Sequence, residues 1–286
     1  MNWQPVIIIG APRSGTNILR DSISEFPGVS TWPCDEINFI WKHGNISFPH
    51  DELSLELLTS SIQLFIRKQF EKIHNKTGCK IVLEKTCANT LRLDYVDKIF
   101  PDAKYIHILR DGRDAVESII RCWKNPVNPP KYYLDKFLIV PPPDRLKVLW
   151  VILRKRFYFK KVHSWRSWGP EFCNLRNLLN EKRPLYEICA FQWLACVSKT
   201  LEFFEKIDPS RYFILKYENF VKNPKPYFFE IGKFLNISVK ENQAEKIIES
   251  ISQKNISKWK LSQYRQKVEN IIPLISNMLH RLNYDI

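Results

Sequence analysis

The sequence predicts an α/β fold in which a central parallel sheet lies between two layers of helices. Two observations support this prediction: short apolar runs rich in β-branched residues alternate with segments of helical periodicity, and a glycine-containing loop follows the first run. Strands that alternate with helices pair in parallel, so their carboxyl ends gather at one edge of the sheet, where ligands bind. We therefore expect functional side chains at that edge.

Four strands are predicted, over residues 6–9, 80–83, 104–109 and 212–215. Helical periodicity predicts helices over residues 18–25, 51–73, 90–100, 114–123, 183–206, 224–235 and 243–252. A closing helix is expected over residues 265–282, broken or kinked at Pro273. The proline-rich stretch 125–143 is typical of a loop or lid.

The composition predicts a single domain over residues 1–286, with a helical or loop insertion around 125–180. A chain of 286 residues with 44% hydrophobic content can bury one large core. Residues 1–5 lead directly into the first strand, so no signal peptide is expected. The seven cysteines include no C-x-x-C pair, which favours free thiols and a cytoplasmic location.

The chain is strongly basic. It has 44 Lys and Arg residues against 30 Asp and Glu, a net charge of +14 that suits acidic partners. Much of this charge lies in residues 145–166, where aromatic residues such as Trp150 and Phe157 are interleaved. Three interpretations stay open for this segment: a solvated helix face, an entrance for an acidic acceptor, or a patch that touches a membrane surface. No nucleic-acid partner is expected, because no recognised nucleic-acid motif accompanies the charge.

The loop after the first strand reads GAPRSGTN, over residues 10–17. A strand, a tight loop and a helix start form the unit that binds phosphate on backbone N–H groups, and it predicts a three-layer fold like that of the P-loop NTPases. Thr16 stands where an NTPase has its phosphate-binding Lys, and Asn17 where it has the Mg²⁺-binding hydroxyl. The loop therefore suits a phosphoryl group without metal-assisted triphosphate chemistry, and no metal is expected.

Polar residues also follow the second and third predicted strands. Lys85, in Glu-Lys-Thr, could stabilise charge on a leaving oxygen, or it could be an ordinary surface lysine at the sheet rim. Arg110 and Ser118 could hold a second phosphate. The alternative is an ion pair that closes the turn, with Asp111 or Asp114 as the partner of Arg110.

These motifs together resemble the sulfotransferase superfamily that uses 3′-phosphoadenosine-5′-phosphosulfate (PAPS). The resemblance includes GAPRSGTN, EKT and HILRDGRDAVES, then RYFILKYENF at 211–220 and SKWK at 257–260, in the order of the family. Segments 165–169 and 189–193 are similar to a bacterial branch, and the cofactor motifs to protein-tyrosine sulfotransferases. The resemblance runs along nearly the whole chain.

The resemblance implies a role for each matching residue. The 5′-phosphosulfate would be bound by Arg13, Ser14, Gly15, Thr16 and Asn17, although the family usually has a second Thr where Asn17 stands. The 3′-phosphate would be bound by Arg110 and Ser118, with Tyr217 near the adenine and Lys258 on the cofactor phosphates. Lys85 would stabilise the transition state at the bridging oxygen.

An alcohol or phenol acceptor also requires a base. Glu36 is the first choice, because it lies roughly where related enzymes carry a catalytic Glu, and Asp35 competes with it. Both acids also have structural interpretations, as a helix N-cap and a first-turn acid. His43 and His50 are the alternative bases, whereas His107 lies within a strand pattern typical of core.

The predicted function is transfer of a sulfuryl group from PAPS to a hydroxyl acceptor, with release of adenosine 3′,5′-bisphosphate. Carbohydrate, peptide tyrosine, lipid and small alcohol are all compatible acceptors. Two alternatives stay open: a non-catalytic protein that binds a nucleotide or an anionic surface, and a kinase with a degenerate phosphate loop. The sequence does not indicate an oligomeric state.

Overall fold

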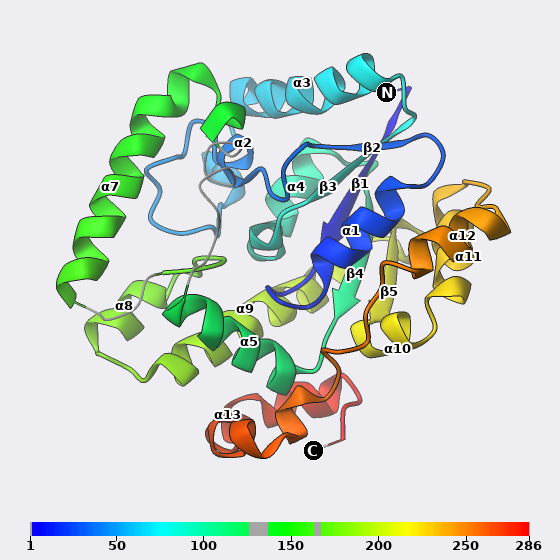
Figure 1. Cartoon of the computed structure of the whole chain (residues 1–286). Helices are drawn as coiled ribbons and strands as arrows, with labels where there is room; N and C mark the ends of the chain where they lie inside the picture. Colours follow the sequence, from blue (N-terminus) through cyan, green and yellow to red (C-terminus); the bar gives the residue numbers. More distant parts are fainter. Residues whose placement is uncertain (1, 126–136, 163–166, 286) are drawn as a thin grey trace.

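The computed structural model describes residues 2–125, 137–162 and 167–285, with side chains described outside 155–162, 262–265 and 267. Its sheet has the order β2-β3-β1-β4-β5, and all the paired strands are parallel (Figure 1). The strands are β1 (Gln4–Ile9), β2 (Val29–Thr31), β3 (Ile81–Lys85), β4 (Lys104–Leu109) and β5 (Tyr212–Lys216). The four predicted strands are confirmed, each within two residues of its expected ends.

The register of the sheet brings the functional segments to one edge. Ile8 of β1 pairs with Lys85 of β3, and Ile9 pairs with His107 of β4. The carboxyl ends of these strands therefore lie side by side. Because β1 lies between β3 and β4, the loop after β1 sits at the centre of that edge, the usual place for a ligand in a doubly wound sheet.

Helices cover both faces of the sheet, as predicted. One face packs against α3 (Ser60–Thr77), α4 (Leu93–Ile99) and the end of α9 (Leu185–Phe204). The other packs against α1 (Thr16–Ser24), α10 (Tyr217–Lys222), α11 (Pro224–Leu235) and α12 (Glu241–Ile248). Ile7 and Val6 of β1 belong to these two opposite cores, because successive strand residues point to opposite faces. The three-layer α/β fold is confirmed.

The remaining helices flank this unit. A third core joins α9 to α5 (Gly112–Lys124), α8 (Leu175–Asn180) and α13 (Ser262–Arg281). The short α2 (Asn38–Trp41) follows β2, and α7 (Arg145–Val162) runs along one side of the molecule (Figure 1). Short 3₁₀ turns lie at Leu55–Leu57, Cys87–Leu91, Pro142–Asp144, Pro209–Arg211 and Lys258–Lys260.

Several predicted boundaries were wrong. The helix expected over 51–73 begins at Ser60, because the Thr59 side chain caps it by accepting from the N–H of Ile62. The helix expected over 90–100 divides into the turn Cys87–Leu91 and α4. The closing helix is not broken at Pro273, which lies on its exposed side, where water can satisfy the carbonyl that loses its N–H partner.

Other predictions fall partly outside the described residues. Residues 126–136 of the proline-rich loop and 163–166 of the basic segment lie there. The described part of the insertion around 125–180 includes α7 and α8, and the division of the chain into one domain with an insertion stays a prediction. All seven cysteines are free. Among the described residues, we find no helix with the length and apolar character needed to span a membrane.

Candidate active site

The loop between β1 and α1 is shaped for an anion. Gly15 precedes α1 with a φ of 94°, in the left-handed region that favours glycine. A Cβ at this position would lie 2.4 Å from the ring of Tyr217, so only glycine allows this close approach. Helix α1 begins at Thr16, and the first N–H groups of a helix have no partner within it. An anionic group suits N–H groups that lack such a partner.

A second polar group lies beside the loop, where the end of β4 meets α5. Arg110 donates to the backbone oxygens of Arg13, at 2.6 Å, and Asn255, at 2.5 Å, and its guanidinium lies 4.6 Å from the ring centre of Tyr217. The Nε of Arg13 donates to Ser118 Oγ over 3.0 Å. Four residues that were predicted to bind the cofactor therefore lie close together: Arg13, Arg110, Ser118 and Tyr217. The Nε of Arg110 is buried and has no hydrogen-bond partner among the described residues, which leaves a donor for a ligand.

The geometry also supports the alternative interpretation, in which Arg110 forms an ion pair that closes the turn after β4. Asp114, one helical turn later, lies 3.7 Å from the Arg110 guanidinium, while Asp111 pairs with Arg113 at 2.8 Å. An ion pair and a ligand site are compatible here, because the Arg110 guanidinium has five donors. Burial raises the pKa of Asp114 above its ordinary value.

The C-terminal basic segment lies over the start of α5. The N–H of Trp259 donates to Asp114 Oδ1 at 2.9 Å, and the Arg113 guanidinium lies 3.8 Å from the Trp259 ring centre. Lys258, half-buried, is in the same short turn. The sequence did not predict these two contacts, because Asp114 and Trp259 are 145 positions apart in the chain. These two contacts of Trp259 hold the turn that contains Lys258 near Arg110.

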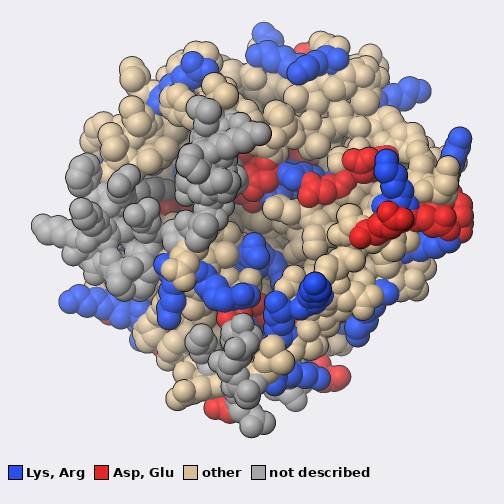
Figure 2. All heavy atoms as spheres, in the orientation of Figure 1, with Lys and Arg blue, Asp and Glu red and all other residues tan. Residues whose placement is uncertain are grey.

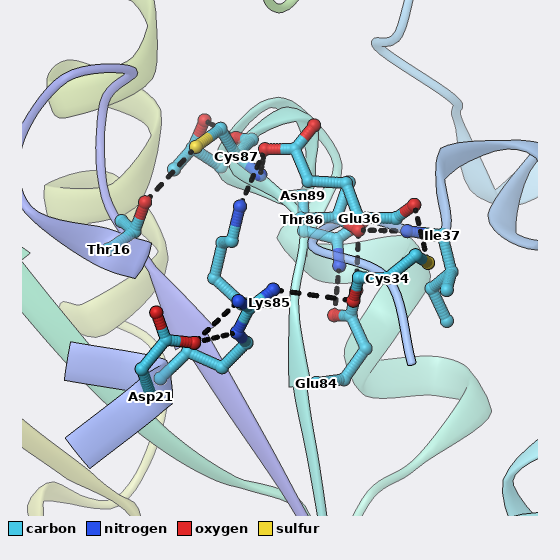
Figure 3. A network of polar contacts seen from close by, with 12 residues as sticks. Thr16, Asp21, Cys34, Glu36, Ile37, Glu84, Lys85, Thr86, Cys87 and Asn89 are labelled. Atoms are coloured by element: carbon cyan, nitrogen blue, oxygen red, sulfur yellow. Dashed lines mark hydrogen bonds and ion pairs between the residues drawn. The ribbon is translucent and has the colours of Figure 1, made fainter. Parts of the chain in front are cut away.

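Lys85 and Glu36 form an ion pair at the end of β3 (Figure 3). Lys85 Nζ donates to Glu36 Oε1 at 3.0 Å, and the backbone N–H of Cys87 donates to the same oxygen at 3.3 Å. Burial opposes the charge of Lys85, but the nearby carboxylates, Glu36 first among them, outweigh burial and raise the pKa of Lys85. The Lys85 side chain is 2% exposed and that of Glu36 25% exposed, so the carboxylate is the partner that solvent can reach.

This pair lines a small hollow in the surface. The residues around it are Thr31, Trp32, Cys34, Asp35, Glu36, Ile37, Glu84 and Lys85. Acidic and basic side chains meet near the middle of the face drawn in Figure 2, with a group of Lys and Arg below them. Within the ion pair at this hollow, Glu36 is the side chain that solvent reaches.

A buried acid holds the segment that carries Glu36. The hydroxyl of Thr86 donates to Glu84 and accepts from the N–H of Ile37 at 3.1 Å, and the Asn89 amide donates to Glu84 at 2.9 Å (Figure 3). Burial raises the pKa of Glu84 to about 7. Sequence reasoning missed this anchor, although its signal was the Glu-Lys-Thr motif itself: a charged residue directly before Lys85 at the end of an apolar strand.

The phosphate loop and the ion pair are neighbours. Thr16 Oγ1 lies 3.5 Å from Cys87 Sγ, within hydrogen-bond distance, and the N–H of Cys87 contacts Glu36 (Figure 3). Burial raises the pKa of the Cys87 thiol, so this cysteine stays protonated and serves as a structural link. One short chain of contacts thus joins the start of α1 to the Glu36–Lys85 pair.

The other predicted residues have different surroundings. Asn17 is exposed in the first turn of α1, and Ser14 is buried within the loop. His43 Nδ1 lies 2.5 Å from Asp144 Oδ2, and its ring stacks on Phe65. Burial lowers the pKa of His50.

Asp35 and His107 also lie where their effects on the site can be assessed. Asp35 is next to Glu36, and its charge helps to raise the pKa of Lys85. His107 is fully buried in β4, where burial lowers its pKa to about 3, as expected for a core histidine. Among the described residues, no three His, Cys, Asp or Glu side chains are grouped so that they could hold a metal ion.

Comparison with known sequences relates the N-terminal part of the chain to sulfotransferases. A model of the sulfotransferase family matches residues 5–137. Protein-tyrosine sulfotransferase 1 of Danio rerio is 32% identical over 130 residues, a match that covers 41% of this chain and 35% of the relative. The enzyme of the same name from Homo sapiens is 28% identical over 130 residues, with 41% and 34% covered. The matches thus span about a third of each relative.

The fold of the whole chain is also that of solved sulfotransferases. A sulfotransferase domain from the curacin biosynthetic pathway aligns with a TM-score of 0.59 at 13% identity, over 99% of both chains. A sulfotransferase from Mycobacterium avium aligns with a TM-score of 0.58 at 12% identity, over 100% of this chain and 78% of the other. The resemblance inferred from the motifs is therefore confirmed, in sequence over residues 5–137 and in fold along the chain.

Proposed function

We propose that this chain, whose residues 5–137 match a model of the sulfotransferase family, transfers a sulfuryl group from PAPS to a hydroxyl acceptor and releases adenosine 3′,5′-bisphosphate. The observation that carries the proposal is the 3.0 Å contact between Lys85 and Glu36, a cation and a carboxylate joined through Cys87 to the phosphate loop. Binding alone would not need such a pair.

PAPS carries two anionic groups, the 5′-phosphosulfate and the 3′-phosphate, and the chain has a suitable place for each. The start of α1 with the loop at 13–17 suits the 5′-phosphosulfate. Arg110, with its unpartnered buried Nε, and Ser118 suit the 3′-phosphate. Tyr217 would lie near the adenine, since its ring already packs against Gly15 and Arg110, and Lys258 would reach the phosphates from its turn.

The chemistry follows from the different exposure of the two charged side chains. PAPS, when bound, supplies the sulfuryl group and the oxygen on which charge develops. Glu36, which solvent reaches, takes the proton of the acceptor hydroxyl. Lys85, held inside and protonated by its neighbours, stabilises negative charge at the bridging oxygen. No metal ion is required, because positioning and fixed charges carry the reaction.

Peptide tyrosine is the first acceptor to test, because the relatives in the sequence comparison are named protein-tyrosine sulfotransferases. Carbohydrate, lipid and small alcohol acceptors complete the panel. The chain spans about a third of those relatives, so the acceptor remains part of the proposal. A cytoplasmic location likewise stays a prediction.

Two measurements on the purified chain test the proposal. Thermal unfolding with adenosine 3′,5′-bisphosphate is compared with ATP plus Mg²⁺, and we expect the bisphosphate to raise the melting temperature. Stabilisation by ATP and Mg²⁺ alone would support a kinase instead. Labelled PAPS is then offered with each acceptor class. Bisphosphate binding without transfer to any of them would favour a non-catalytic binding protein.

A further inference from the structure

Helix α7 presents a row of apolar side chains to solvent. Leu146, Leu149, Trp150 and Leu153 stand at positions i, i+3, i+4 and i+7, the spacing of one helix face. Leu146 is 81% exposed and Trp150 61% exposed, and the other two are exposed as well. We call these four residues the α7 stripe. A surface helix normally directs such a row into the core, so the exposed row needs a partner.

The opposite side of α7 already has its core contacts. Val148 is fully buried and packs in a small cluster with Ile46 and Val140, and Val151 lies against that cluster. Helix α7 therefore does not need to turn its stripe inward to be held in place. The helix runs along one side of the molecule, on the opposite side from α11 and α12 (Figure 1).

The segment of the chain that carries the stripe is basic in sequence. Residues 145–161 contain seven Lys or Arg residues and no Asp or Glu: Arg145, Lys147, Arg154, Lys155, Arg156, Lys160 and Lys161. Lys147 and Arg154 are exposed on the same flank of the stripe, two helical turns apart, and the Arg154 guanidinium lies 5.4 Å from the Trp150 ring centre. Apolar and cationic groups thus form one continuous surface.

This combination selects among the partners that could cover the stripe. A second copy meeting it face to face would bring the same cations together, which costs energy. Nucleic acid would satisfy the cations but would leave the leucines against phosphate and water. An anionic bilayer suits both groups, because lipid phosphates attract the cations and the acyl boundary accepts leucine and tryptophan.

We propose that the α7 stripe docks this chain on the surface of an anionic membrane. The helix lies parallel to the bilayer, with Leu146, Leu149, Trp150 and Leu153 at the acyl boundary and Lys147 and Arg154 among the headgroups. Of the helices that the structure describes, none can cross a membrane, so this contact is peripheral. The docking surface is separate from the sulfuryl-transfer site, and its test does not depend on transfer.

Co-sedimentation with lipid vesicles tests the proposal. The purified chain is mixed with vesicles of phosphatidylcholine alone and with vesicles that also contain phosphatidylserine. We expect binding to the second kind only, weakened by salt. Two double variants, Leu149→Gln with Trp150→Gln and Lys147→Glu with Arg154→Glu, should each reduce the vesicle partition coefficient about tenfold or more. Because all four side chains are on the surface, the thermal unfolding of both variants should match that of the unchanged chain.

The chain offers a matched control on α11. Phe229 and Lys233 are also an exposed aromatic residue and an exposed cation four positions apart. Phe229→Gln with Lys233→Glu should leave vesicle binding unchanged. Absent binding, equal binding to both kinds of vesicle, or an equal loss in the control would overturn the proposal. A dimer in light scattering that Leu149→Gln with Trp150→Gln abolishes would assign the stripe to a second copy and also overturn it.

Discussion

Lys85 donates a 3.0 Å hydrogen bond to Glu36 across the carboxyl end of β3. The two residues are 49 positions apart in the chain, and their side chains differ in exposure, at 2% for Lys85 and 25% for Glu36. In the proposed transfer to a hydroxyl, the protonated lysine held inside would stabilise negative charge and the carboxylate open to solvent would accept a proton.

Replacing Lys85 by alanine should reduce turnover far more than donor binding. Loss of one fixed charge at a developing oxyanion costs about 10²–10³-fold in rate. The affinity for adenosine 3′,5′-bisphosphate, measured by calorimetry, should change only a few-fold. Lys80→Ala is the matched control, because Lys80 is exposed and precedes the same strand at the opposite edge of the sheet. Equal losses of turnover and binding in Lys85→Ala would show that Lys85 only binds.

Replacing Glu36 by glutamine should abolish most of the turnover and preserve bisphosphate binding. Loss of a general base costs about 10²–10⁴-fold. The change also removes the main group that raises the pKa of Lys85, so burial should then lower that pKa and shift the basic limb of the pH–rate profile to lower pH. Asp35→Asn is the neighbouring control. Normal turnover in Glu36→Gln would move the base to Asp35, His43 or His50.

Replacing Arg110 by alanine should mainly weaken donor binding. Hydrogen bonds from a charged group contribute about 1.5–3 kcal/mol, which corresponds to roughly a 10–150-fold loss of bisphosphate affinity. Turnover at saturating PAPS should fall much less. Arg183→Ala, which removes an exposed arginine paired with Glu187 near the start of α9, should change neither quantity. Unchanged affinity in a folded Arg110→Ala protein would leave Arg110 as the ion-pair partner of Asp114 only.

Glu84 should make stability depend on pH. Burial raises its pKa from 4.5 to about 7 in the folded state, so the folded chain holds this proton more tightly than the unfolded chain. The stability that protonated Glu84 contributes is complete below pH 4.5 and is lost as the pH rises through about 7. Urea unfolding across this range should show a smaller decline for Glu84→Gln. An identical decline in both proteins would contradict this assignment.

The cost of adding a side chain at Gly15, beside Tyr217, can be measured by comparison with Gly28, which also has a positive φ. Gly28→Ala reports the positive φ alone, since no atom lies within 4 Å of the added Cβ, and should cost about 1–2 kcal/mol of unfolding free energy. Gly15→Ala adds a contact of 2.4 Å with the Tyr217 ring and should cost about 1–3 kcal/mol more. Adding Tyr217→Ala to each variant should recover the extra cost only beside Gly15→Ala. Equal costs in the two single variants would contradict the clash.

Local features were predictable because they depend on neighbours in the chain. The run 6–9 and the loop that follows it predicted β1 and the start of α1, and the spacing of Arg110 and Ser118 placed both on one turn and helix. The strand β2 was not predicted, because its three residues are too few to show the hydrophobic pattern of a strand. The start of α3 depended on the Thr59 cap, which competes with the apolar periodicity that continued before it.

The sequence by itself determined the α/β class, the edge of the sheet where the candidate site lies and the resemblance to sulfotransferases, because periodicity and motif order are written along the chain. Tertiary structure decided which acid meets Lys85. The Glu84–Thr86–Ile37 contacts hold the segment of Glu36 beside β3, whereas His43 is held by Asp144. Side chains so far apart in sequence are brought together only by packing, and the low exposure that keeps Lys85 paired with Glu36 exists only in the folded chain.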